Sequence, residues 1–72
     1  MNPVDQIKRG IDVACTKQRI SIIEASEKAG IAPSTLYRFI SGGDIRLKTL
    51  AAFMNDGLGL KFETVLRMGR ES

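Results

Sequence analysis

Residues 20–42 read ISIIEASEKAGIAPSTLYRFISG, and this stretch contains the start and stop signals of two short helices. Ser21 is followed three residues later by Glu24, which is the capping-box arrangement at the start of a helix. Gly30 supplies the left-handed backbone conformation that ends the first helix. Pro33 is a favoured first residue for the second helix. The sequence therefore predicts two helices joined by a tight turn.

This predicted helix-turn-helix covers residues 22–41, and its spacing matches the packing that such a pair needs. A small residue is required where the two helices cross, and Ser26 is at that position. Apolar residues are required just after the turn and twice in the second helix: Ile31, Leu36 and Phe39. The outward face of the second helix then carries four polar or aromatic side chains: Ser34, Tyr37, Arg38 and Ser41.

One further helix is predicted on each side of this pair. Asn2 and Pro3 form a helix-start signal, and apolar residues at three- and four-residue spacing extend that helix to about Lys17. A glycine-dense loop at residues 41–44 precedes a helix from about Leu47 to Asp56. Its predicted inward side chains are Leu47, Leu50, Ala51 and Met54.

The period of the apolar residues changes after Gly59. Residues 60–68 alternate in a way that is typical of a strand of about eight residues. This strand would have no partner within the chain, so we expect it to pair with the same strand of a second copy. The predicted dimer strand carries Leu60, Phe62, Thr64 and Leu66. The alternatives for this segment are a fifth helix or a disordered tail.

The composition limits the classes of protein to which the chain can belong. Its 72 residues suffice for one compact domain, and the 43% hydrophobic and 26% charged fractions are typical of a folded globular chain. No apolar run approaches the ~20 residues of a membrane span, so we expect a cytoplasmic protein without a membrane segment. Cys15 is the only cysteine and histidine is absent, so we expect neither a metal nor a cofactor. Cys15 itself is expected to be a small buried hydrophobe.

The charge is moderately basic and unevenly distributed. The net charge is +3, which favours polyanionic partners without identifying one. Residues 16–50 carry the whole excess, with six basic side chains against three acidic ones. The basic residues are Lys17, Arg19, Lys28, Arg38, Arg46 and Lys48. Charge alone predicts a solvated surface equally well.

Two stretches resemble a known family. Residues 20–42 resemble the helix-turn-helix of the Cro/CI (XRE-type) family of phage repressors and bacterial regulators. Residues 46–63, RLKTLAAFMNDGLGLKFE, are similar to the helix that follows it in that family. The resemblance implies a mainly α, four-helix lambda-repressor-like domain over residues 1–72, with a C-terminal strand at about 60–68 for dimerisation. It further implies a repressor that binds a palindromic operator in double-stranded DNA as a homodimer.

The resemblance also implies roles for individual residues. Base-reading roles fall on Pro33, Ser34, Tyr37, Arg38 and Ser41, and Arg38 suits a bidentate hydrogen bond to guanine. Phosphate-binding roles fall on Lys17, Arg19, Thr35, Arg46 and Lys48. Two residues depart from the family pattern. Ile22 replaces a common phosphate-binding glutamine, and Ala25 replaces a usual leucine.

Other functions remain open at this point. An antitoxin of a toxin–antitoxin pair would bind a toxin as well as DNA, and a recombinase or excisionase module would only position DNA. A helical protein-interaction module would bind a protein through Ile22, Ile23 and Phe53, which the sequence leaves exposed. An enzyme is not expected, because histidine is absent and the acidic residues are scattered singly.

Overall fold

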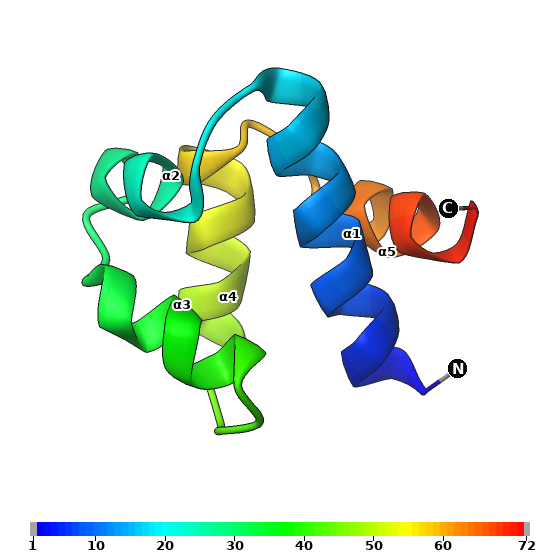
Figure 1. Cartoon of the computed structure of the whole chain (residues 1–72), viewed down its shortest axis with the longest axis horizontal. Coiled ribbons are helices and arrows are strands. Elements are labelled where there is room, and N and C mark those ends of the chain that lie inside the picture. The colour runs from blue at the N-terminus through cyan, green and yellow to red at the C-terminus, as the bar shows by residue number, and fades with distance from the viewer. Residues whose placement is uncertain (1, 72) are drawn as a thin grey trace.

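Helices account for most of residues 2–71, the part of the chain that the structure, a computed structural model, describes (Figure 1). In chain order they are α1 (Pro3–Gln18), α2 (Ile22–Lys28), α3 (Pro33–Ile40), α4 (Leu47–Ala52) and α5 (Phe62–Glu71). A π-helical turn, η1 (Phe53–Gly57), continues α4 without a break. Within residues 2–71, none of these helices has the length and apolar character that a membrane crossing requires.

The first three helices begin where the local sequence signals predict. The Asn2 side chain caps α1 by accepting a hydrogen bond from the Asp5 amide at 2.8 Å. The capping box of α2 is present in both directions, because the Glu24 amide donates to Ser21 Oγ at 3.0 Å and the Ser21 amide donates to Glu24 Oε1 at 3.4 Å. Pro33 is the first residue of α3. These starts are therefore set by side chains next to them in sequence.

The crossing between α2 and α3 also has the predicted form. Gly30 adopts the left-handed conformation with a φ of 71°, and the Ile31 amide donates to the Ser26 carbonyl at 2.9 Å. Ser26 is fully buried between the helices, and Leu36 and Phe39 of α3 lie in the core. The turn thus fixes α3 with one face inward and the opposite face in solvent.

The predicted C-terminal strand is wrong. Residues 60 and 61 lie in a connection, residues 62–71 form α5, and residues 2–71 contain no strand. The apolar residues also fit a helical period: Phe62, Val65, Leu66 and Gly69 recur at three- and four-residue spacing and face inward. The predicted dimer strand is therefore absent, because Leu60, Phe62 and Leu66 pack on the core of their own chain and Thr64 lies within α5. The described part has five helices rather than four, with η1 counted as part of the fourth.

α5 packs directly on α1 through two glycines that no sequence pattern singled out. A Cβ atom at Gly69 would collide with the carbonyl of Gln6, and one at Gly10 would collide with the carbonyl of Val65. The side-chain amide of Gln6 donates to the Leu66 carbonyl at 2.7 Å and ties the two helices together. The backbones of α1 and α5 thus approach more closely than any side chain would allow.

The fourth helix differs from its predicted inward face at two positions. Leu47 was expected in the core but is 69% exposed. It is the first residue of α4, and the buried residue of that helix, Leu50, lies three residues later. Phe53, three residues after Leu50, is fully buried. η1 also brings Gly57 against α2, where a Cβ atom would lie 2.5 Å from the Ala25 carbonyl. The small size of Ala25 and Gly57 therefore lets the two elements touch.

Ser26 leads to a prediction about stability. Its hydroxyl is fully buried and has no hydrogen-bond partner among the described residues. A buried hydroxyl without a partner is destabilising, so Ser26→Ala is expected to raise the free energy of unfolding by about 1 kcal/mol. Urea denaturation followed by circular dichroism measures this change. Ser34→Ala, at an exposed position of α3, is the control for helix propensity and should change stability less; a destabilised Ser26→Ala would contradict the prediction.

Candidate functional site

The outward face of α3 is exposed and polar. Ser34, Tyr37 and Arg38 are exposed, and Ser41 is exposed at the C-terminal end of the helix. Pro33 is half-buried at the first position. The inward face is held by the core and by a cation–π contact from Lys8 of α1 to the ring of Phe39 at 5.4 Å. α3 is therefore a rigidly mounted helix whose free face could contact a partner.

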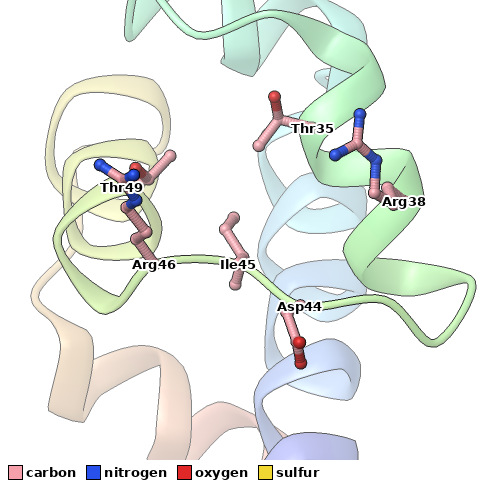
Figure 2. A pocket seen from close by; sticks show the side chains of 6 residues that line it. All are labelled: Thr35, Arg38, Asp44, Ile45, Arg46 and Thr49. Carbon is pink, nitrogen blue, oxygen red and sulfur yellow. The ribbon is translucent and has the colours of Figure 1, made fainter.

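A shallow depression of about 470 Å³ lies beside this face, between α3 and the start of α4 (Figure 2). Thr35 and Arg38 line it from α3, and Arg46 and Thr49 line it from the other wall. The connection between the two helices contributes the remaining lining residues, Asp44 and Ile45. The structure thus brings three predicted site residues together: Thr35, Arg38 and Arg46.

The electrostatics of the depression favour an anion. Arg38 and Arg46 place two guanidinium groups on it, and neither forms an ion pair with any residue in 2–71. Asp44 is the only acidic lining residue, and Figure 2 shows its carboxylate pointing away from both arginines. Two like charges at one depression repel each other unless an anion lies between them. Guanidinium groups are the side chains best suited to bind phosphate or carboxylate oxygens.

Thr49 is a lining residue that sequence reasoning missed. It follows Arg46 by three residues, so the two share one face of α4. That spacing was readable in the sequence, but nothing local shows that this face of α4 is turned toward α3. The depression therefore depends on tertiary packing that local signals do not contain.

Lys17 and Arg19 lie away from this depression. They are at the C-terminal end of α1, which Figure 1 shows at the opposite end of the molecule from the loop after α3. Arg19 lines a second depression with Ser21 at the start of α2. Lys17 lines a third with Met68 and Glu71 of α5. The five predicted phosphate-binding residues are thus not on one continuous surface.

Cys15 is buried, as predicted, and burial raises the pKa of its thiol above the usual 9.0, with a smaller contribution from the nearby Asp12 carboxylate. A raised pKa favours the protonated thiol in the folded state, so this contribution to stability is lost as the pH rises above 9. We expect Cys15 to react slowly with a thiol reagent at pH 8 in the native protein and rapidly in urea. Native reactivity equal to that of free cysteine would contradict this.

The surface suggested for a protein-interaction module is largely absent. Phe53 is fully buried and Ile22 is half-buried against the core, so the suggestion that they are exposed is wrong for Phe53 and only partly right for Ile22. Ile23 is exposed. A single exposed isoleucine on α2 is an ordinary surface feature and does not make an apolar binding patch.

Comparison with protein-family models, with curated proteins and with solved structures finds no match for this chain. The geometry of α3 and its neighbouring depression is therefore the structural basis for a functional proposal.

Proposed function

We propose that the protein is a sequence-specific DNA-binding transcriptional regulator, most simply a repressor, whose α3 is the recognition helix. The observation that carries this proposal is the exposed polar face of α3 beside two arginines that lack carboxylate partners among residues 2–71. The resemblance of residues 20–42 and 46–63 to Cro/CI regulators supports the same function, and with it a lambda-repressor-like arrangement of the first four helices.

Base reading falls to the exposed residues of α3. A recognition helix contacts base edges in the major groove mainly with its N-terminal residues. Ser34 and Tyr37 supply hydroxyl groups there, while Pro33 offers only an apolar contact, for example to a thymine methyl group. Ser41 caps the C-terminal end of the helix, away from the residues that reach base edges, so we do not carry over the base-reading role that the resemblance implied for it.

Phosphate binding falls to the residues around the start of α4. Arg46 and Lys48 are exposed there, and Thr35 lines the neighbouring depression from α3. Arg19, beside the start of α2, is a further proposed phosphate contact at the other end of the helix pair. Such contacts position the protein on DNA and make its affinity depend on salt.

A binding experiment with a charge-matched control tests the proposal. Fluorescence anisotropy with a labelled duplex is measured at several salt concentrations for the wild type and for Arg46→Ala/Lys48→Ala. Loss of two phosphate contacts should weaken binding roughly fiftyfold at 0.1 M salt and make the slope of log K against log salt shallower by about two. The control Lys61→Ala/Arg67→Ala removes the same charge from and beside α5, on the other side of the molecule (Figure 1). Equal losses in both variants, or no salt-dependent binding by the wild type, would refute the proposed surface.

Selection of bound sequences from a random DNA pool tests specificity and symmetry together. The proposal expects one enriched sequence, and absence of enrichment would refute sequence-specific binding. The homodimer stays a prediction, now without the strand on which it rested. Two inverted copies of a half-site about one helical turn apart would support it, and a single asymmetric site would contradict it.

A role as an antitoxin remains compatible with the same DNA-binding surface. It requires an additional toxin-binding surface, and the described residues show no feature that identifies one. The DNA-binding regulator is therefore the function that we put forward.

A further inference from the structure

We propose that Arg38 binds a phosphate of the DNA backbone rather than a base edge, and that Gly43 is the positioning residue that directs it there. This inference rests on the proposed DNA-binding function. It changes the role that the sequence resemblance gave to Arg38, which shares the outward face of α3 with Ser34 and Tyr37. Three features of Arg38 favour a phosphate: its position along α3, the contacts of its side chain, and the polar and charged residues around its guanidinium group.

Arg38 lies toward the wrong end of α3 for base reading. The helix begins at Pro33 and ends at Ile40, and Arg38 is in its last turn. The residues of a recognition helix that reach base edges lie mainly in the N-terminal part of the helix. We therefore expect Arg38, in the last turn, to lie closer to the backbone phosphates than to the base edges.

The side chain of Arg38 packs on the glycine loop that follows α3. The Gly43 amide donates a hydrogen bond to the Arg38 carbonyl at 2.8 Å. A Cβ atom at Gly43 would lie only 2.8 Å from Arg38 Cγ, 2.9 Å from the Arg38 carbonyl oxygen and 3.4 Å from Arg38 Cδ. The aliphatic part of Arg38 therefore runs along a backbone surface that only glycine leaves open. This contact holds the side chain at the loop beside the depression.

The guanidinium group of Arg38 has neighbours that suit a phosphate. Thr35 lines the same depression from one turn earlier in α3, and Figure 2 shows its hydroxyl on the same side as the guanidinium group. Arg46 and Thr49 face it from the other wall. Two guanidinium groups and two hydroxyls around one open depression provide several donors for the oxygens of a single phosphate.

The variant Arg38→Ala separates the two roles. Affinity is measured for the duplex selected from the random pool and for an unrelated duplex of equal length. Loss of a phosphate contact should weaken both about tenfold at 0.1 M salt, leave their ratio within about twofold, and make the salt slope shallower by about one. Weakening confined to the selected duplex, with an unchanged salt slope, would show that Arg38 reads a base and would overturn the proposal.

A double-mutant cycle tests Gly43. Its backbone is not in the left-handed region, so Gly43→Ala is free of the backbone strain that alanine would suffer at Gly42, whose φ is 108°. We expect Gly43→Ala to weaken binding to both duplexes roughly threefold in the wild type. The effect should be clearly smaller when Arg38 is already alanine, because only the contact with the backbone carbonyl of residue 38 then remains. An equal loss in both backgrounds would show that Gly43 does not act through Arg38.

The control for this cycle is Gly42→Ala, which strains the same loop without approaching Arg38, since a Cβ atom added at Gly42 would have no neighbour within 4 Å. Its effect on binding should be equal in both backgrounds. Thermal melting followed by circular dichroism confirms that each variant is folded. Failure of the wild type to bind DNA would refute the proposed function itself, whereas salt-dependent binding that Arg38→Ala leaves unchanged would refute only this inference.

Discussion

Replacement of Gly69 by alanine is expected to lower the free energy of unfolding by about 3 kcal/mol. The added Cβ atom would overlap the Gln6 carbonyl and approach the Gly10 amide nitrogen to 3.0 Å. These are backbone atoms within α1, so neither can move aside as the end of a long side chain would. α5 would have to separate from α1, and the contacts of the buried Val65 would be weakened. Urea denaturation followed by circular dichroism measures the loss.

A second glycine provides the matched control. A Cβ atom added at Gly30 would have no neighbour within 4 Å, so Gly30→Ala introduces only the strain of a left-handed alanine. That strain costs about 1 kcal/mol. If Gly69→Ala is no more destabilised than Gly30→Ala, the close approach of α1 and α5 is wrong.

Replacement of Phe53 by alanine is expected to lower the free energy of unfolding by about 3 to 5 kcal/mol, because the ring is fully buried and leaves a cavity. A domain of this size is at the low end of protein stability, so a loss of this magnitude would leave a substantial unfolded fraction at 25 °C. The population is measured from the ellipticity at 222 nm and from the urea midpoint.

Leu47 is the control for Phe53, because both belong to the continuous segment formed by α4 and η1 but only Phe53 is buried. Leu47→Ala removes an exposed apolar side chain and should change stability by no more than about 0.5 kcal/mol. The sequence pattern placed Leu47 inside and Phe53 outside. A larger loss for Leu47→Ala than for Phe53→Ala would therefore favour the pattern over the structure.

The elements that the sequence predicted correctly are those with local signals. Asn2 and the Ser21–Glu24 pair mark helix starts through contacts within three residues. Pro33 marks a start through the fixed φ of its ring, and Gly30 marks a turn through its own backbone. Such signals are complete within a short window of sequence. They require no knowledge of what the helix packs against.

The C-terminal segment shows why the remainder was not predictable in the same way. Leu60, Phe62 and Leu66 fit an alternating pattern, and the deciding residue is Val65, which is outward in a strand but fully buried in α5. The helix is selected by its packing on α1 through Gly10 and Gly69, residues 59 positions apart in sequence. The spacing of apolar residues within residues 60–68 cannot predict that contact.

In the candidate site, too, local features were predictable from the sequence and tertiary contacts were not. The exposed face of α3 follows from the spacing of Leu36 and Phe39, so its outward residues were readable from the sequence. The depression was only partly predictable, because it is lined both by Thr35 and Arg38 of α3 and by Thr49 of α4. The loop contact of Gly43 with Arg38 depends on the path of the chain after α3 and had no sequence signal of its own.

The arrangement of α1 and α5 provides two attachment sites that lie away from α3. The start of α1 and the end of α5 lie on one side of the molecule, while α3 lies on the other (Figure 1). A biotin or a dye attached at an exposed residue at the start of α1 or at the end of α5 would therefore project away from the surface assigned to DNA. Surface-immobilised binding measurements can use either attachment site, and agreement between the two orientations would be an internal check on every affinity measured.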